Sequence, residues 1–428
     1  MTYQSMTREQ LEQEQARLTA AFAKVKAQKL TLDMSRGKPG KEQLELVMDM
    51  LDTIDSHSNL IGENGMDYRN YGVPEGVIES RRLFADLMEV PVDNVLVMGN
   101  SSLNIMFDVI AHAMTHGVMG GTPWTKQEQV RFLCPVPGYD RHFGILQHFG
   151  IEMINVTMTE NGPDMDQVEA LVNTDASIKG IWCVPKYSNP QGYSYSDETV
   201  RRLAALKPAT ADFRLYWDNA YAVHHLYADD QDQLLEILAA CRENGNEDLV
   251  YEFCSTSKIS FPGAGVAALI SSEANLADLK KAFFYQTIGH DKLNQLRHAR
   301  YFRDPAGVAA KMKEHAEVLR PKFEAVWKVL EREIAPLGIG SWTTPKGGYF
   351  ISFETLEGCA AAVVAKCKEG GMVLTGAGAP FPYGKDPKDT NIRIAPTFPA
   401  VAEMEQAAEL FALCVKLVSV DKLLREMA

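Results

Sequence analysis

Short apolar runs alternate with helix-like segments from about residue 75 to about residue 300. Seven of these runs, each bounded by turn residues, are expected to be strands buried on both faces of a sheet. They are residues 95–98, 131–134, 152–156, 180–184, 214–217, 249–253 and 266–270. Because strands that alternate with helices pair mostly in parallel, the pattern predicts an α/β fold with a mostly parallel, doubly wound, seven-stranded sheet.

The pattern changes after about residue 305, where one long helix is expected over residues 308–334. Three short strands and two further helices follow. The strands are expected near residues 349–353, 372–374 and 392–394, and the helices near residues 356–369 and 400–425. These elements predict a second, smaller α+β domain. Two domains are also expected from the length of 428 residues, because chains of this length normally form two cores.

Composition argues against several classes of protein. The net charge of −13 disfavours nonspecific nucleic-acid binding, which needs a basic face. No apolar run is long enough to cross a bilayer. The N-terminus is not expected to be a signal peptide, because it is polar, mixed in charge and lacks an apolar central region. Thr7 and Gln10 form a capping-box pattern that opens a helix. Seven scattered cysteines without a CxxC pair are typical of reduced thiols in the cytoplasm rather than of disulfides or zinc ligands.

Two residues at predicted strand ends carry candidate chemistry. Lys258 follows the strand at 249–253, and a neutral lysine amine, favoured by burial, can form an imine with an aldehyde. Asp218 directly follows the strand at 214–217, and a carboxylate there can hold a pyridine nitrogen protonated. Each has an ordinary alternative: a solvated lysine, and an aspartate that caps a helix. Residues 255–258 also match the S-x-x-K motif of penicillin-binding enzymes, but neither S-D-N nor K-T-G occurs in the chain.

A phosphate site is expected after the first predicted strand. Ser101 and Ser102 follow residues 95–98 and open an apolar helix. The free N–H groups and the dipole of a helix N-terminus favour phosphate, although serine is also a common helix cap.

These residues occur in a characteristic order together with two further motifs, Asn189-Pro190-Gln191-Gly192 and Asn391-Ile392-Arg393. The set resembles a fold-type-I, pyridoxal-phosphate-dependent aminotransferase of the aspartate aminotransferase fold. Residues 35–40, 256–266 and 345–350 are most similar to the MocR-like branch, in which aspartate aminotransferases occur. The resemblance implies a discontinuous small domain, formed by residues 1–50 and 306–428 around a large cofactor-binding domain at residues 51–305.

The resemblance assigns most of these positions to pyridoxal 5′-phosphate. Lys258 would hold the cofactor and move the proton, Asp218 would pair with the pyridine nitrogen, and Tyr221 and Asn189 would bind the phenolic oxygen. Three serines would bind the phosphate: Ser101, Ser102 and Ser255. Tyr139 would stack on the ring, with a core aromatic as the alternative. Tyr71 would reach the phosphate of a neighbouring subunit, which implies a homodimer.

The resemblance also assigns a substrate site. Arg393 would bind the substrate α-carboxylate through its planar fork, with Gly37 and Asn189 beside it, and Tyr349 is expected near the pocket. In many relatives an arginine about eight residues after the lysine binds the phosphate, but residues 262–266 contain none. A residue for the distal carboxylate of a dicarboxylate substrate also has no obvious match. The open candidates are Arg36, Arg141, Lys292 and Arg297.

The expected reaction is transamination between L-aspartate and 2-oxoglutarate, with amino acids and 2-oxo acids as partners and no metal. One alternative is another pyridoxal-phosphate reaction on the same fold, such as alanine or aromatic transamination or C–S lysis. A second is a ligand-sensing regulator. About three dozen residues precede Gly37 and predict a single helix, which is too little for a helix-turn-helix module.

Overall fold

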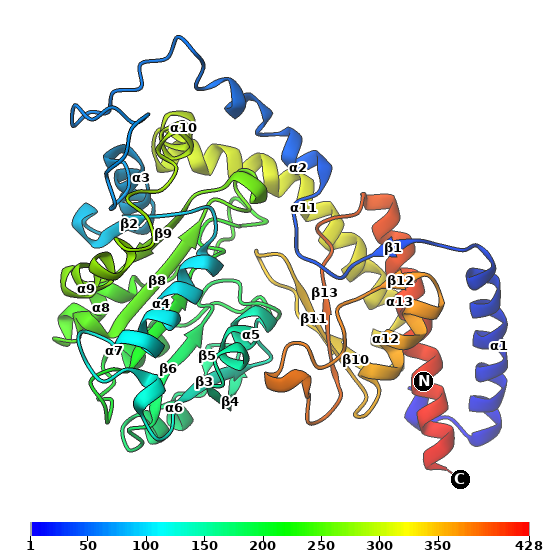
Figure 1. Ribbon diagram of the computed structural model, residues 1–428. Helices are drawn as coiled ribbons and strands as arrows, with labels where there is room; N and C mark the ends of the chain where they lie inside the picture. The colour runs from blue at the N-terminus through cyan, green and yellow to red at the C-terminus, as the bar shows by residue number, and fades with distance from the viewer. Residues whose placement is uncertain (1, 428) are drawn as a thin grey trace.

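A central eight-stranded sheet organises the larger part of the protein, seen in a computed structural model that describes residues 2–427 (Figure 1). The strand order is β2-β9-β8-β7-β6-β3-β4-β5. The strands are β2 (Val95–Val97), β3 (Arg131–Val136), β4 (Glu152–Thr159), β5 (Gly162–Pro163), β6 (Ile178–Cys183), β7 (Arg214–Asp218), β8 (Val250–Ser255) and β9 (Ala267–Ile270). All seven expected strands are confirmed, and β5 adds a two-residue antiparallel partner for β4.

Five neighbouring strands, from β8 to β4, run parallel, whereas β9 is antiparallel to both β8 and β2. The strand β2 therefore runs in the same direction as β8. As a result, the carboxyl ends of β2, β3, β6, β7 and β8 lie at one edge of the sheet, where ligands of such folds bind.

Helices cover both faces of this sheet, which explains why its strands are apolar throughout. In β7, Leu215 and Trp217 belong to one core cluster and Tyr216 to the other. One face packs against α4 (Ser102–His116), α5 (Asp140–His148) and α9 (Glu273–Phe283). The other packs against α3 (Ile78–Met88), α6 (Met165–Val172), α7 (Asp197–Ala204) and α8 (Ile237–Glu243). The alternation of the two core clusters along one strand is the signature of a sheet buried on both sides.

The smaller part follows α10 (Lys292–Phe302) and begins with the long helix α11 (Pro305–Glu333), as expected. Its antiparallel sheet has the order β10-β11-β13. Its remaining elements are β10 (Gly340–Trp342), β11 (Ile351–Thr355), α12 (Ala360–Glu369), β12 (Met372–Val373), β13 (Asn391–Ile394) and α13 (Val401–Glu426). Each expected element is present, although β11 and α12 begin a few residues later than the sequence pattern indicates.

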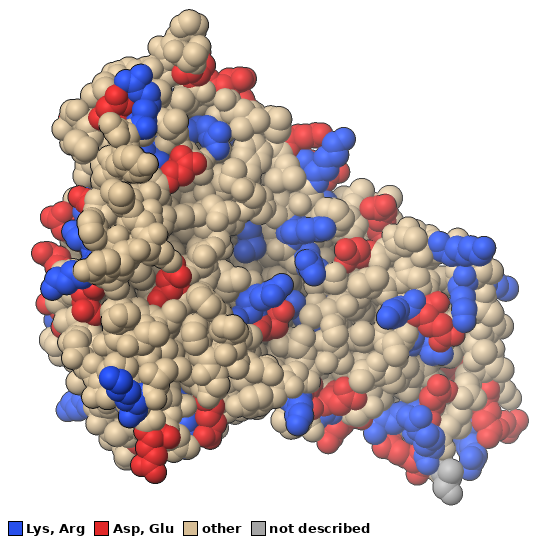
Figure 2. Space-filling model, viewed as in Figure 1, with Lys and Arg blue, Asp and Glu red and all other residues tan. Residues whose placement is uncertain are grey.

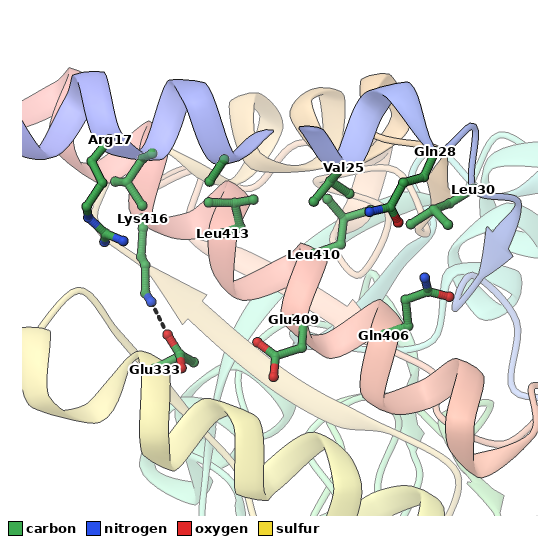
Figure 3. Close-up of a pocket in the computed structure, with 12 residues that line it drawn as sticks. Arg17, Val25, Gln28, Leu30, Glu333, Gln406, Glu409, Leu410, Leu413 and Lys416 are labelled. Atoms are coloured by element: carbon green, nitrogen blue, oxygen red, sulfur yellow. Dashed lines mark hydrogen bonds and ion pairs between the residues drawn. The ribbon is translucent and has the colours of Figure 1, made fainter. Parts of the chain in front are cut away.

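The N-terminal segment lies against the C-terminal elements. The side chain of Thr7 accepts a hydrogen bond from the Gln10 backbone and caps α1 (Arg8–Ala27), which confirms the capping box. Buried residues of α1 share a core with α13, and β1 (Leu32–Asp33) pairs in parallel with β12. A shallow groove of about 280 Å³ remains between α1 and α13, and the Lys416–Glu333 ion pair lies at one end of it (Figure 3). The short helix α2 (Lys41–Glu45) then leads toward the central sheet.

Three further properties concern the described residues as a whole. Among residues 2–427, no helix combines the length and the apolar character that a bilayer span requires. The seven cysteines are all buried and free. Within the same residues, no group of His, Cys, Asp and Glu side chains has an arrangement that could hold a metal ion.

Candidate active site

A cavity of about 690 Å³ opens at the carboxyl edge of the central sheet and is closed on its other side by residues of the smaller part. In the view of Figure 2, which has the orientation of Figure 1, Lys and Arg side chains gather near the middle of the molecule. Ten of the eleven residues expected at the site line the cavity. They are Gly37, Ser101, Ser102, Tyr139, Asn189, Asp218, Tyr221, Ser255, Lys258 and Arg393. The fold therefore brings together residues that are up to 356 positions apart, from Gly37 to Arg393.

Lys258 lies in a short loop that leaves β8 and is held by Thr256. The backbone N–H of Thr256 donates to the Val266 carbonyl at 2.8 Å, and its side chain accepts from the Val266 N–H at 2.9 Å. The Lys258 Nζ lies 4.9 Å from the centre of the Tyr221 ring. Burial lowers the pKa of the Lys258 amine, while the Asp218 carboxylate acts in the opposite direction. The environment thus increases the fraction of neutral amine, the form that attacks an aldehyde.

Asp218 ends β7 and is 4% exposed. Its Oδ2 lies 2.9 Å from His142 Nε2, so the histidine donates this hydrogen bond to the carboxylate. The His142 ring stacks on Trp182, with ring centres 4.1 Å apart. The other oxygen, Oδ1, is buried and has no hydrogen-bond partner among the described residues. Asp218 therefore retains one acceptor for a donor inside the cavity, and the pyridinium N–H of pyridoxal phosphate fits this requirement.

The hydroxyl groups expected at the phosphate lie at the start of α4 and at the end of β8. Ser101 is the N-cap of α4, but its side chain makes no capping hydrogen bond, so the hydroxyl is available. Ser255 donates to Ser257 Oγ at 3.2 Å, and Ser257 also lines the cavity although the sequence did not single it out. Val266, at the position where many relatives have an arginine, is 1% exposed and lies in the core. The serines and the helix N-terminus can hold a phosphate without that arginine.

Two tyrosines provide neutral hydroxyl groups at the cavity wall. Burial, with a smaller contribution from Asp218, raises the pKa of Tyr139 to about 12. Tyr221 is 4% exposed, and burial raises its pKa well above the usual value. The Tyr139 ring lies 4.8 Å from that of His142, in an edge-on arrangement. Both hydroxyls stay protonated at neutral pH and can therefore donate hydrogen bonds.

Arg393 enters the cavity from β13 and is 6% exposed. Its Nη1 donates to Asp140 Oδ1 at 2.8 Å and to Asn189 Oδ1 at 3.3 Å, and its Nη2 donates to Thr375 Oγ1 at 3.2 Å. The guanidinium lies 5.0 Å from the centre of the Phe350 ring. The Nε is buried and has no partner among the described residues. A rigidly held arginine with spare donors is suited to binding a carboxylate.

Gly37 packs tightly against Phe350, the aromatic residue that lies beside Arg393. A Cβ atom at Gly37 would lie 2.4 Å from Cζ of Phe350, closer than any side chain tolerates. Tyr349, expected near the pocket, is not part of the cavity wall, and Phe350 takes that place. The Tyr349 hydroxyl instead accepts a hydrogen bond from Gln43 in the buried core.

The four candidates for a distal carboxylate fall into two groups. Arg36 and Arg141 line the cavity, and neither side chain makes a hydrogen bond or an ion pair with another residue in the described range 2–427. Lys292 lies outside the cavity wall and donates to the Gly72 carbonyl at 3.2 Å. Arg297 also lies outside the cavity wall and donates a hydrogen bond to Oδ1 of Asn294 on α10.

Tyr71, expected at the phosphate of a neighbouring subunit, also lies outside the cavity. Its side chain is 78% exposed, and its hydroxyl makes no hydrogen bond with any residue in the described part of the chain. Its assignment to a neighbouring subunit stays a prediction.

Comparison with known proteins identifies the family. Residues 6–427 match the family model described as Aspartate amino-transferase. The chain is 44% identical over 401 residues to an aspartate aminotransferase of Corynebacterium glutamicum, covering 94% of this chain and 92% of the relative. The crystal structure of an aspartate transaminase from the same organism has a TM-score of 0.96 at 42% identity and covers 99% of both chains.

A more distant structure shares the fold. It is an α-aminoadipate aminotransferase of Thermus thermophilus, complexed with N-(5′-phosphopyridoxyl)-L-leucine, with a TM-score of 0.72 and 20% identity over 91% of this chain and 92% of that chain. The protein is accordingly an aminotransferase of the fold-type-I class, whose members use pyridoxal phosphate, and it belongs to the aspartate aminotransferase family.

Proposed function

We propose that this aminotransferase transfers the amino group of L-aspartate to 2-oxoglutarate. The observation that carries the substrate class is the charge of the cavity wall, which contains four cationic side chains besides Lys258, and two carboxylates. The cations are Arg36, Lys38, Arg141 and Arg393, and the carboxylates are Asp140 and Asp218. Such an excess favours substrates with two carboxylates. Both substrates of the proposed reaction are of this kind, and a relative at 44% identity is named an aspartate aminotransferase.

The substrate would be held at both ends by residues of one subunit. Arg393 binds the α-carboxylate, with Asn189 and the backbone of Gly37 beside it. Arg36 and Arg141, whose side chains form no ion pair with another of residues 2–427, are available for the distal carboxylate. Holding both carboxylates fixes the Cα–H bond relative to Lys258, and this orientation makes the proton transfer effectively intramolecular.

The cofactor, when bound, supplies an electron sink for the negative charge that develops at the substrate Cα. Lys258 Nζ removes the Cα proton as a general base and then returns a proton as a general acid. Asp218 Oδ1 would accept the pyridinium N–H of the bound cofactor, and His142 fixes the Asp218 carboxylate from its other oxygen. The hydroxyl of Tyr221 and the amide of Asn189 would bind the phenolic oxygen, Tyr139 would lie beside the ring, and Ser101, Ser102 and Ser255 would hold the phosphate.

We also propose a homodimer in which Tyr71 completes the partner's phosphate site. Tyr71 is 78% exposed, and further large apolar side chains are exposed between α9 and α10: Phe284 at 56%, Tyr285 at 91% and Ile288 at 50%. A group of exposed apolar side chains typically marks an interface. Lys292 ties this region to Tyr71's neighbour Gly72, which supports a common surface.

Three further assignments complete the proposal. The two-part small domain, residues 1–50 with 306–428, is supported by the core that α1 shares with α13 and by the β1–β12 pair. Membership of the MocR-like branch is supported by the sequence motifs. A cytoplasmic location is supported by the seven free cysteines.

An absorption experiment tests the reaction. The visible band of the cofactor bound to Lys258 should bleach when L-aspartate is added without oxo acid and return with 2-oxoglutarate. A band that ignores aspartate but responds to another amino acid would overturn the substrate, and the absence of any band after adding pyridoxal phosphate would overturn the cofactor site.

Charge removal tests the distal subsite. Arg36→Met and Arg141→Met should each lower kcat/KM for L-aspartate and leave that for L-alanine unchanged, because alanine has no distal carboxylate. Arg201→Met is the matched control, since Arg201 is an exposed arginine of α7 that pairs with Glu243 away from the cavity. Equal losses for both amino acids would contradict the assignment.

A further inference from the structure

Asp140 occupies one donor of Arg393, the residue that the proposed function assigns to the substrate α-carboxylate. It is the first residue of α5, lines the cavity and has a side chain that is 34% exposed. Its Oδ1 accepts a hydrogen bond from Nη1 of Arg393 at 2.8 Å, while the Arg393 side chain is only 6% exposed. A carboxylate of the protein therefore sits on the same guanidinium that is expected to bind a carboxylate of the substrate.

The other contacts of Arg393 are neutral and already fix its position. Thr375 donates its hydroxyl hydrogen to the Ser35 carbonyl, so its oxygen is free to accept from Arg393 Nη2. Asn189 accepts from Nη1, and the guanidinium lies over the Phe350 ring. Orientation is thus provided without Asp140. Among the described residues, Asp140 is the one that adds a negative charge to Arg393.

We propose that Asp140 is an internal competitor for the substrate α-carboxylate and sets the affinity of the site. In the ligand-free enzyme it neutralises a buried guanidinium, which would otherwise be an unpaired buried charge. When substrate binds, two carboxylates share one guanidinium and repel each other, so binding exchanges one ion pair for another. The free energy gained on binding is therefore smaller than it would be at an unpaired arginine, and the acidic product leaves more readily.

The position of Asp140 allows this exchange. A carboxylate in the first turn of a helix is stabilised by the helix dipole and by free N–H groups. Asp140 stands in the first turn of α5, and its partly exposed side chain can move into the cavity solvent. The displaced carboxylate is therefore still stabilised after it leaves Arg393, which keeps the exchange reversible.

The inference rests on the assignment of Arg393 in the proposed function, and one set of measurements separates the two. Asp140→Asn removes the charge and keeps an acceptor oxygen for Arg393. The probe is succinate, a dicarboxylate without an amino group, and the holoenzyme is used throughout. The readouts are the melting temperature with and without succinate, the Kd for succinate, and the KM values for aspartate and 2-oxoglutarate.

Asp140→Asn should melt at a lower temperature than the wild type without ligand, yet be stabilised more by succinate. Its Kd for succinate should fall by about five-fold or more, and both KM values should fall with it. Thr375→Val is the matched control: it removes a neutral contact of the same guanidinium, so its Kd should rise. If Asp140 only supported the position of Arg393, Asp140→Asn should raise the Kd for succinate in the same way.

An unchanged or raised Kd in Asp140→Asn would overturn the inference, provided that the wild type binds succinate and Arg393→Ala does not. If the wild type fails to bind succinate, or if Arg393→Ala binds it equally well, the assignment of Arg393 fails and the inference fails with it.

Discussion

The buried carboxyl group of Glu252 should control how the stability of the protein depends on pH. Glu252 lies in β8, is 2% exposed and accepts one hydrogen bond, from Asn219 Nδ2 at 3.1 Å. Its Oε2 has no partner among the described residues. Burial, followed by repulsion from Glu236, raises the pKa of Glu252 from 4.5 to about 8. Glu252 is therefore protonated in the folded protein at neutral pH.

The sign of the effect follows from proton binding. Between about pH 4.5 and 8 the folded state keeps the proton on Glu252, whereas the unfolded chain has lost it. The folded state thus binds more protons, and stability falls as the pH rises through this window. The decrease is about 1.4 kcal/mol per pH unit and reaches roughly 4 kcal/mol at about pH 7.5.

Glu252→Gln should remove this loss, because the amide stays neutral and keeps an acceptor for Asn219. For 428 residues the unfolding entropy is about 0.9 kcal/mol/K, so roughly 4 kcal/mol corresponds to about 4 °C in melting temperature. The assay is thermal unfolding of the holoenzyme at about pH 5 and about pH 7.5. The variant should melt within about 1 °C of the wild type at the lower pH and about 4 °C above it at the higher pH.

Glu243→Gln is the control, because Glu243 has a side chain that is 67% exposed and should give no pH-dependent difference. A constant difference between Glu252→Gln and the wild type at both pH values would refute the reasoning. It would mean that Glu252 has the same pKa in the folded and unfolded states.

Three more predictions concern the cavity. Lys258→Ala should abolish turnover and the visible band of the bound cofactor, and turnover near the wild-type level would remove Lys258 from catalysis. Arg393→Ala should raise KM for both the amino acid and the oxo acid more than it changes kcat, since it removes binding common to ground and transition states, and unchanged KM values would reject it as the carboxylate receptor. Gly37→Ala should lower stability by about 1–3 kcal/mol through its clash with Phe350, measured by urea unfolding, and wild-type stability would show that the ring moves freely.

Much of the fold was predictable because the information is local. Each strand of the central sheet is a compact apolar run between turn residues, so its existence is visible in the sequence. The strand β5 escaped detection because two residues, Gly162 and Pro163, carry no such pattern. Asp218 and Lys258 both follow predicted strands, and the carboxyl ends of parallel strands share one edge of a sheet. Both residues line the cavity at that edge.

Pairs of side chains between distant elements were not predictable in the same way. Asp140 and Arg393 are 253 positions apart, and nothing in either local sequence marks the other as a partner. Ser257 was overlooked for a different reason: it stands in the same run of hydroxyl residues as Ser255, and the sequence does not show which hydroxyls point into the cavity. Tyr349 and Phe350 were likewise indistinguishable, because adjacent residues exchange faces with a small change in where a strand begins.

The contact between His142 and Asp218 shows which information was missing. Asp218 ends β7 and His142 follows β3, and in the sheet these strands are separated by β6, which carries Trp182. The imidazole lies on the Trp182 ring, with ring centres 4.1 Å apart, and reaches the Asp218 carboxylate across that strand. A lone histidine in a sequence has no visible function, and it acquires one here because the strand order β7-β6-β3 places a flat aromatic support between it and the carboxylate. The hydrophobic pattern of the sequence locates the strands and the residues at their ends, but it does not give the order of the strands in the sheet. That order determines which side chains surround Asp218.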